Sequence, residues 1–210
     1  SGRGQRSVTV MDLALDDTTV LVTGASGGIG RALVGTFAAE GAQVVCLGHK
    51  GFDDLTAWLA AQPFAERCLA LAADVRASEE LDEAFVAAIE RFGRIDVAVA
   101  NAGRWPAADV PFHAIDPDRV RRTVETNLLG AAWTARAFLE ARARRGPRTG
   151  GHGASLVFIG STAGRFGERD HADYAMAKAG LVGLMLSLKN EIVRLDPYGR
   201  VNLVEPGWTA

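Results

Sequence analysis

The first apolar run of the chain leads directly into a glycine-rich turn at residues 24–30. Its glycines Gly24, Gly28 and Gly30 precede a segment in which apolar side chains recur at every fourth position. In a strand–turn–helix unit, such glycines let the chain turn tightly, let the backbone approach a ligand and let the helix pack against the strand. The turn therefore predicts an opening β–α unit whose helix N-terminus can hold a phosphate group. A plain tight turn is the alternative.

Further apolar runs alternate with helix-like segments along the rest of the chain. Most of the runs are short and lack alternation of apolar and polar residues, which is typical of parallel strands buried on both faces. The predicted strands are Thr19–Thr23, Gln43–Leu47, Cys68–Ala72, Ile95–Ala100, Leu156–Gly160 and Arg200–Val204. This alternation predicts an α/β fold with a single doubly wound Rossmann-type parallel sheet, flanked by helices and without a second domain.

The helix-like segments carry local signals of their own. Ser78 is the expected N-cap of one helix, since two glutamates follow it in the first turn. The expected apolar stripes are Ile29, Leu33 and Phe37 on the first helix, and Leu181, Leu184, Leu188 and Ile192 on the last. The arginine- and glycine-rich stretch at residues 140–153 predicts a basic helix end followed by a mobile loop, rather than an anion site.

Length and composition fit one globular domain. The 210 residues, 48% hydrophobic and 23% charged, suffice for one core. A net charge of -2 gives no reason to expect nucleic acid or an anionic membrane as partner, and no apolar run is long enough to span a bilayer. Cys46 and Cys68 fall in predicted strands, so we expect free thiols and a cytoplasmic location. Residues 1–10 are interpreted as a tag remnant or disordered extension, and residues 11–210 as the domain.

Tyr174 and Lys178 lie four residues apart in a helix-like segment, so their side chains share one helix face. Ser161 stands just after the fifth predicted strand. A phenol alone is a weak acid, with a pKa of about 10, and a nearby ammonium favours the phenolate. Alone, each residue would be a surface or capping residue; beside a phosphate-holding turn, the set predicts proton transfer next to a bound dinucleotide.

The chain resembles the short-chain dehydrogenases/reductases, in their one-domain subfamily, over nearly all of residues 12–210. The matching pieces, in the family's order and spacing, are Thr23-Gly24-x-x-x-Gly28-Ile29-Gly30, Asp74-Val75, Asn101-Ala102-Gly103, Asn127, Ser161, Tyr174-x-x-x-Lys178 and Pro206-Gly207. Ala100 departs from the pattern, since the family often has a second asparagine there. Family members continue past the equivalent of Ala210 with a substrate-covering segment, which we expect to be absent here.

The resemblance implies an oxidoreductase that transfers hydride between NADP(H) and a carbonyl or secondary alcohol. Tyr174 would be the general acid or base, and Lys178 would hold the nicotinamide ribose and lower the pKa of Tyr174. Ser161 would bind the substrate oxygen, while Asn127 would shape its helix and hold a water of the proton relay. The expected cofactor-binding residues are Gly24, Ser26, Gly28, Ile29, Gly30, His49, Lys50, Asp74, Val75, Asn101, Ala102, Gly103, Tyr174, Lys178, Pro206 and Gly207.

The three residues that directly follow the second predicted strand bear on the choice of cofactor. NAD-specific chains place an acid near the end of this strand, where it binds the ribose 2′-hydroxyl. By resemblance that position is Gly48, which has no side chain, and the basic His49 and Lys50 follow. We therefore expect NADP(H) to be preferred, with NAD(H) as the alternative, although Gly27 stands where phosphate-binding relatives often have another basic residue.

Two other functions use related folds: a non-catalytic dinucleotide-binding regulator, and an epimerase or dehydratase of the larger two-part relatives. The proton-transfer set argues against the first, and the glycine spacing and short chain argue against the second. The family analogy also predicts a homodimer or homotetramer formed through the helices that contain Asn127 and Tyr174. The acidic and histidine residues just before Tyr174 are expected to form a solvated loop without a metal: Glu168, Asp170, His171 and Asp173.

Overall fold

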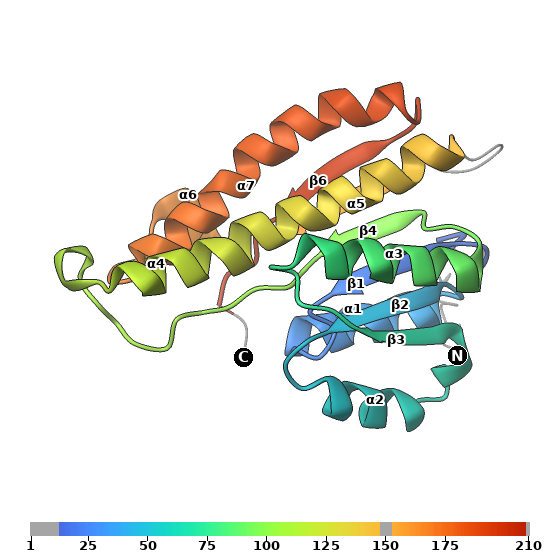
Figure 1. Cartoon of the computed structure of the whole chain (residues 1–210), viewed down its shortest axis with the longest axis horizontal. Coiled ribbons are helices and arrows are strands. Elements are labelled where there is room, and N and C mark those ends of the chain that lie inside the picture. The colour runs from blue at the N-terminus through green and yellow to red at the C-terminus, as the bar shows by residue number, and fades with distance from the viewer. Residues whose placement is uncertain (1–12, 148–152, 209–210) are drawn as a thin grey trace, which may run out of the picture.

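The computed structural model describes residues 13–147 and 153–208. The extension expected at residues 1–10 and much of the loop expected before residue 153 lie outside these ranges. Within the described residues, six parallel strands form one sheet in the order β3-β2-β1-β4-β5-β6 (Figure 1). The strands are β1 (Thr19–Thr23), β2 (Gln43–Gly48), β3 (Cys68–Ala72), β4 (Val97–Ala100), β5 (Ser155–Ile159) and β6 (Arg200–Val204).

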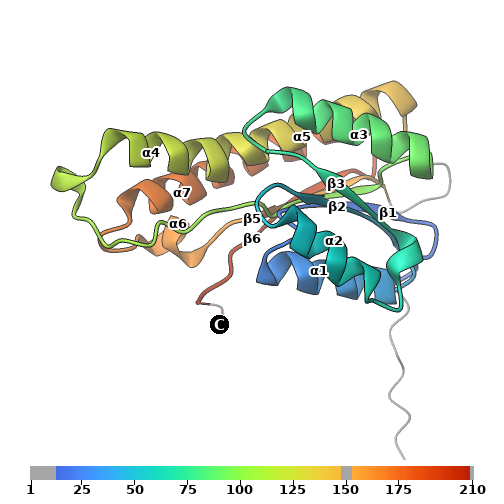
Figure 2. The same ribbon diagram turned by 60° about the horizontal axis from the view of Figure 1, so that its bottom comes forward.

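Helices connect the strands and cover both faces of the sheet. They are α1 (Gly28–Ala39), α2 (Phe52–Ala60), α3 (Ser78–Phe92), α4 (Pro117–Val124), α5 (Gly130–Arg145), α6 (Thr162–Phe166) and α7 (Ala172–Glu191). A π-helical stretch, Glu125–Leu129, joins α4 to α5. Helices α1 and α2 lie on one face, and α3, α5 and α7 lie on the other (Figure 2). No helix within the described ranges combines the length and apolarity needed to cross a membrane.

The sheet is buried on both faces, as its apolar strands predict. Every residue of β1 is buried, although its side chains alternate between two clusters. Val20 and Val22 pack with Val34 of α1, whereas Leu21 belongs to the cluster that contains Phe138 of α5. A strand with both faces covered must be apolar throughout, which explains why the sequence shows runs rather than alternation.

The predicted strands are confirmed, with small differences at their ends. β1, β3 and β6 have the predicted bounds. β2 extends to Gly48, β4 begins at Val97 rather than Ile95, and β5 begins and ends one residue earlier than predicted. Cys46 is buried, Cys68 is partly buried, and both thiols are free, as expected. The stripe predicted on α7 also packs against the core, with Leu181 fully buried.

Two local helix predictions are wrong. Ala77, not Ser78, occupies the N-cap position of α3, and no side chain caps this helix. The buried face of α1 is shifted by one position from the predicted stripe, because Gly30 sits against the preceding turn. Its buried residues are Gly30, Val34 and Ala38, while Leu33 and Phe37 are only partly buried and Ile29 is 37% exposed.

The sheet order creates a crevice at the carboxyl ends of β1 and β4. The chain runs from β1 outward to β2 and β3, then crosses back to place β4 on the other side of β1. The loops that follow β1 and β4 therefore leave in opposite directions and open a gap at this edge. The glycine turn, Asn101-Ala102-Gly103, and Ser161 after β5 all come from this edge.

The predicted basic end of α5 is confirmed, with Arg142, Arg144 and Arg145 in its last turn, but one of these arginines is buried. Arg142 is only 2% exposed, and its Nη2 donates to Asp196 Oδ2 at 3.2 Å and to the carbonyl of Gly146 at 2.9 Å. The same Asp196 oxygen accepts the backbone N–H of Ala154 at 2.9 Å. The arginine therefore ties α5 to the start of β5 and to the loop before β6. Arg144, by contrast, is exposed and pairs with Glu140.

We expect Arg142→Ala to lower the free energy of unfolding by about 3–5 kcal/mol, because it leaves the Asp196 carboxylate buried without its cation. Arg144→Ala is the matched control on the same helix, and it should change stability by about 0.5 kcal/mol or less because its ion pair is exposed. Urea denaturation of both variants measures the difference. Similar values for the two substitutions would contradict the structural role assigned to Arg142.

Candidate active site

The glycine turn packs so closely that side chains cannot be accommodated at two of its positions. Gly24 has a φ of +64°, and a Cβ there would lie 2.7 Å from Ala102 Cα. A Cβ on Gly30 would collide with the carbonyl oxygen of Gly24. A Cβ on Gly28 would meet nothing within 4 Å, since this glycine faces open space. The turn thus combines tight packing behind with an open face in front.

The open face of the turn is the N-terminus of α1. Gly27 is the N-cap and has no side chain to accept a hydrogen bond, so the first-turn N–H groups are free of side-chain caps. They border a cavity of about 800 Å³ lined by Gly24, Ser26, Gly27, Gly28, Ile29, Gly30, Ala32, Lys50, Asn101, Gly103 and Trp105. Unpaired N–H groups and the positive end of a helix dipole suit a pyrophosphate at this place.

The end of β4 is fastened to the turn by hydrogen bonds. Thr23 Oγ1 accepts the backbone N–H groups of Asn101 and Ala102, both at 3.0 Å. Asn101 Nδ2 donates to the carbonyls of Thr23 at 2.9 Å and Gly24 at 3.1 Å. The side chain of Asn101, an expected cofactor contact, therefore serves to hold the turn. Asn101 and Gly103 both line the cleft.

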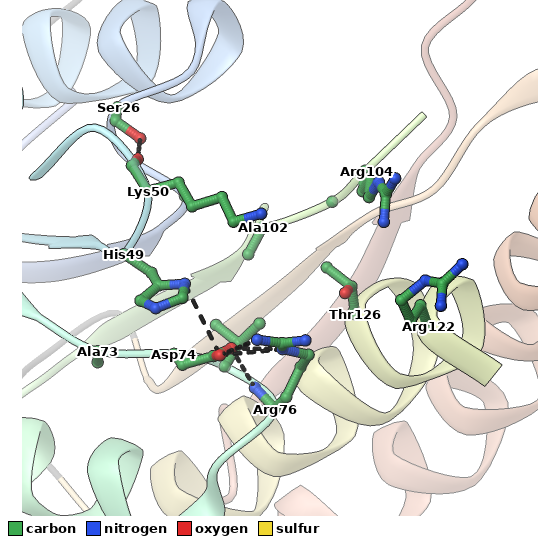
Figure 3. A pocket seen from close by; sticks show the side chains of 13 residues that line it. Ser26, His49, Lys50, Ala73, Asp74, Arg76, Ala102, Arg104, Arg122 and Thr126 are labelled. Atoms are coloured by element: carbon green, nitrogen blue, oxygen red, sulfur yellow. Dashed lines mark hydrogen bonds and ion pairs between the residues drawn. The ribbon is translucent and has the colours of Figure 1, made fainter. Parts of the chain in front are cut away.

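A second cavity, of about 350 Å³, lies beside the ends of β2 and β3 (Figure 3). Ser26 Oγ donates to the carbonyl of Lys50 at 3.1 Å, and the Lys50 side chain extends across the cavity toward Ala102. Among the described residues, the Lys50 ammonium has no hydrogen bond or ion pair. The lining comprises Gly24, Ser26, His49, Lys50, Ala73, Asp74, Val75, Arg76, Ala102, Gly103, Arg104, Arg122 and Thr126.

Asp74 is paired with two basic groups in this cavity (Figure 3). Arg76 Nε lies 3.0 and 2.9 Å from its two carboxylate oxygens, and His49 Nδ1 lies 3.7 Å away. The hydrogen bond from Arg76 is the largest influence that holds the pKa of Asp74 below its usual value. Arg76, Arg104 and Arg122 were not among the predicted site residues. Only Arg76 had a sequence signal, its position two residues after Asp74.

Asn127 lies at the centre of the π-helical stretch between α4 and α5, and it is 1% exposed. Its Oδ1 accepts the backbone N–H of Arg104 at 3.0 Å, and its Nδ2 donates to the carbonyl of Arg104 at 3.0 Å. Nδ2 also bonds the carbonyl of Thr123. Asn127 thus clamps the loop after β4 onto the helix. π-Helical turns often mark functional sites. Here Asn127 Oδ1 lies close to Gly103, and Gly103 lines the cleft.

Lys178 projects from α7 into the same cleft and is 4% exposed. Its Nζ donates to the carbonyl of Ile159 at 2.7 Å and lies 5.7 Å from the centre of the Tyr174 ring. Burial lowers the pKa of Lys178 to about 8. A cavity of about 180 Å³ here is lined by Ile29, Asn101, Gly103, Arg104, Trp105, Ile159, Gly160, Ser161, Tyr174, Lys178, Pro206 and Gly207.

Tyr174 has a raised pKa in this arrangement. Burial of the phenol is the larger cause, and a hydrogen bond with Ser161 acts in the opposite direction. Lys178 is not among the causes of this shift, so its expected lowering of the Tyr174 pKa stays a prediction. Ser161 is also the N-cap of α6, where its Oγ accepts the N–H of Ala163 at 3.2 Å.

Two tryptophan rings that the sequence did not predict as site residues lie close to Tyr174. The Trp105 ring contacts Tyr174 edge-on, with centroids 4.8 Å apart, and Trp208 at 5.7 Å. Both tryptophans border a cavity of about 280 Å³ lined by Trp105, Ser161, Thr162, Ala163, Glu168, Tyr174, Gly207 and Trp208. Pro206 is fixed beside Ser161, because its carbonyl accepts the N–H of Thr162 at 3.0 Å.

The segment before Tyr174 is not the solvated loop that the sequence indicates. His171 is 3% exposed and Asp173 is fully buried, where it pairs with Arg119 of α4. In the part of the chain that the structure describes, no group of three or more histidine, cysteine or acidic residues could hold a metal ion.

The four cavities adjoin one another and suit a dinucleotide followed by a small substrate. Gly103 lines three of them and Trp105 lines three, so the cleft continues from Asp74 past the glycine turn to Tyr174. The open N-terminus of α1 suits the pyrophosphate, and the cationic 350 Å³ cavity suits one terminal nucleoside. The buried Lys178 and the half-buried Tyr174 lie at the other end, where a second nucleoside would reach.

Comparison with known proteins agrees with this geometry. The short chain dehydrogenase family model matches residues 18–210. The chain is 38% identical to the L-rhamnose 1-dehydrogenase (NAD(P)(+)) of Azotobacter vinelandii, over 94% of this chain and 75% of that protein. It is 32% identical to the 3-oxoacyl-[acyl-carrier-protein] reductase MabA of Mycobacterium tuberculosis, over 90% of this chain and 68% of that protein.

A solved structure gives the same result. A short-chain dehydrogenase/reductase of Brucella melitensis, described as a glucose/ribitol dehydrogenase, superimposes with a TM-score of 0.79 at 30% identity, covering 94% of this chain and 78% of that one. The chain thus spans about two thirds to three quarters of the length of these proteins. It belongs to the short-chain dehydrogenase/reductase family, whose named relatives here are an NAD(P)-linked dehydrogenase and a reductase.

Proposed function

We propose that this enzyme transfers hydride between NADP(H) and a small carbonyl or secondary alcohol, with Tyr174 as the general acid or base. The observation that carries the proposal is the convergence of Tyr174, Ser161 and Lys178 on one cavity that continues into the glycine turn. When bound, the nicotinamide supplies or accepts the hydride. A non-catalytic regulator would need the cleft but not this set of proton-transferring groups.

Tyr174 and Ser161 act on the reacting oxygen of the substrate. The Ser161 hydroxyl holds this oxygen by a hydrogen bond, and the Tyr174 phenol gives it a proton as the alkoxide develops. The raised pKa of Tyr174 keeps the phenol protonated, as reduction requires. Oxidation requires the phenolate, which the Lys178 ammonium and the positive charge of an oxidised nicotinamide both favour.

Lys178 has two functions in this proposal. It is charged at neutral pH even though burial lowers its pKa to about 8. Its ammonium has one bond to the carbonyl of Ile159 and donors left for the nicotinamide ribose hydroxyls. Asn127 supports this end of the cleft by holding the loop that carries Gly103.

Lys50 supports the preference for NADP(H). Its ammonium reaches into the cavity at the end of β2, whereas His49 and Arg76 both contact Asp74 (Figure 3). The Asp74 charge is offset by Arg76, which leaves Lys50 to meet a 2′-phosphate. Gly48 is less suited to test this preference than its sequence position indicates. A Cβ there would lie 3.0 Å from Leu55 Cδ2, so an acid would be directed at apolar side chains of α2.

The substrate is proposed to be a small or medium organic molecule bound between Trp105, Ser161 and Tyr174. The relative that acts on L-rhamnose makes a cyclic polyol one candidate for a screen of carbonyls and alcohols. A cytoplasmic location and a homodimer or homotetramer formed through α4, α5 and α7 also belong to the proposal, the latter on family analogy alone.

Tyr174→Phe should reduce kcat by at least ~10²–10⁴-fold, because it removes the proton donor and leaves the ring packing intact. Tyr198→Phe is the matched control, since Tyr198 is the other tyrosine of the chain and is 73% exposed. Nicotinamide absorbance measures turnover, and fluorescence titration should show unchanged cofactor binding in both variants. More than a tenth of the wild-type turnover in Tyr174→Phe would refute the assignment.

Lys178→Met should change the pH dependence of stability as well as abolish turnover. The pKa of Lys178 is about 8 in the folded protein, against 10.5 for a solvated lysine, so the unfolded chain binds more protons between these values. The wild-type free energy of unfolding should therefore rise relative to Lys178→Met as pH increases from 8 to 10.5, by up to about 3 kcal/mol.

Denaturation of the cofactor-free proteins across this pH range measures the difference. Lys189→Met is the control on the same helix, because Lys189 is exposed. A difference between wild type and Lys178→Met that does not vary with pH would show that burial does not perturb this lysine.

Wild-type protein should bind NADPH about ten- to a hundred-fold more tightly than NADH, as one charge-assisted hydrogen bond allows. Lys50→Ala should remove most of this preference while leaving NADH affinity nearly unchanged. Titration at low salt avoids screening of the exposed phosphate contact, and Lys189→Ala controls for the loss of a surface charge. Equal or tighter binding of NADH by the wild type would overturn the assigned preference.

A further inference from the structure

A buried polar cluster surrounds the start of α7, directly beside Tyr174. Asp173 is fully buried, and its carboxylate accepts bonds from Arg119 Nε at 3.1 Å and Arg119 Nη2 at 3.2 Å. Thr123 Oγ1 donates to the same carboxylate at 2.8 Å. Burial alone would raise the pKa of Asp173, but the bonds from Arg119 and Thr123 outweigh it and leave the pKa lowered. The pair is therefore ionised at neutral pH.

Arg119 also holds the two loops that meet at this point. It donates to the carbonyl of Ala108 in the loop after β4, at 2.5 Å, and to the carbonyl of Asp170 before α7, at 3.3 Å. Its Nη2 lies 3.4 Å from His171 Nδ1, and His171 Nε2 lies 2.9 Å from Asp109 Oδ1. Since arginine can only donate, Nδ1 accepts and Nε2 carries the hydrogen given to Asp109.

The cluster contacts the reacting side chain by two routes. The His171 ring stacks on Trp105 with centroids 3.9 Å apart, and Trp105 in turn packs against Tyr174. Along the backbone, the N–H of Tyr174 bonds the Asp173 carboxylate and contributes to its lowered pKa. Helix α4, the loop after β4 and the start of α7 are thus joined around one ion pair.

We propose that Arg119 and Asp173 are positioning residues for Tyr174. Resting on the function proposed above, the inference is that this ion pair fixes the first turn of α7, with one charge on the residue before Tyr174 and the opposite charge on α4. A buried ion pair is weak evidence for stability, because replacing both charges with neutral groups is often harmless. Removing one charge alone leaves an unbalanced field, and its sign determines the direction in which the phenol pKa moves.

The other charged groups near Tyr174 are present in every protein of this comparison, although His171 loses its contact with Arg119 in Arg119→Met. Lys178 lies on the same helix as Tyr174. Glu168 lines the cavity beside the two tryptophans, and Arg104 lines the cavity that also contains Lys178. His171 and Asp109 face the cluster from the loops. All of these groups are common to the wild type and to the variants, so a difference between opposite substitutions reports on the Arg119–Asp173 pair.

The test uses Tyr198→Phe as the background, so that phenolate absorbance in the ultraviolet reports Tyr174 alone. Asp173→Asn leaves the Arg119 cation unbalanced and should lower the Tyr174 pKa by ~0.5 unit or more. Arg119→Met leaves the Asp173 anion unbalanced and should raise it by a similar amount. The double variant should return to within ~0.2 unit of the background. The pH profile of kcat should move in the same directions.

Matched controls come from the exposed Arg121–Asp118 pair on the same helix, whose side chains are 68% and 64% exposed. Arg121→Met and Asp118→Asn should leave the Tyr174 titration unchanged. Arg119→Lys keeps the charge but loses the two-pronged contact, so kcat should fall while the pKa stays in place. It also provides a milder variant if Arg119→Met unfolds, which circular dichroism would reveal.

Shifts of the same sign in the two single variants, or no shift in folded variants, would overturn this inference, as would an altered titration in the exposed controls. The proposed function is tested independently. Turnover retained by Tyr174→Phe would refute that function, whatever the titrations of the Arg119 and Asp173 variants show. Loss of turnover in Tyr174→Phe together with unshifted titrations would refute the positioning role alone.

Discussion

Close packing of backbone at the end of β1 determines where the functional groups of this protein lie. Gly24 contacts the backbone of Ala102, and Gly30 contacts the carbonyl of Gly24, so a side chain at either glycine would separate the turn from β4 or tilt α1. Thr23 and Asn101 fasten the same contact with hydrogen bonds. The N-terminus of α1 therefore opens into a crevice of fixed width, and the groups after β4 and β5 face it across a short distance.

The opposite end of the cleft combines groups that burial makes unfavourable as ions. Lys178 is charged against a lowered pKa, and Tyr174 is neutral because of a raised one. Such sites lower the stability of the protein. In return, a partly desolvated environment strengthens the electrostatic interaction with each charge that a ligand brings. In the protein without cofactor, desolvation dominates the phenol. We propose that the pKa of Tyr174 falls only when the cofactor is bound, and not through Lys178 alone.

The sequence predicted features that depend on local pattern. Strands buried on both faces appear as apolar runs, so β1, β3 and β6 were placed to the residue, and the ordered motifs identified the cleft. Features set by distant contacts were missed or misread. The burial of Arg142 depends on Asp196, and that of Asp173 depends on Arg119, each 54 residues away in the chain. Trp105 gave no signal because its partners His171 and Tyr174 lie at the start of α7, far along the chain from the loop after β4.

We propose that charge brought into the partly buried cleft by the oxidised cofactor converts Tyr174 from an acid into a base. The most direct test of this claim is the phenolate absorbance of Tyr198→Phe protein, titrated with pH in the absence and in the presence of saturating oxidised cofactor. We predict that the pKa of Tyr174 lies above that of free tyrosine without cofactor and falls by at least ~1 unit when it is bound. A pKa that does not change on binding would contradict the claim.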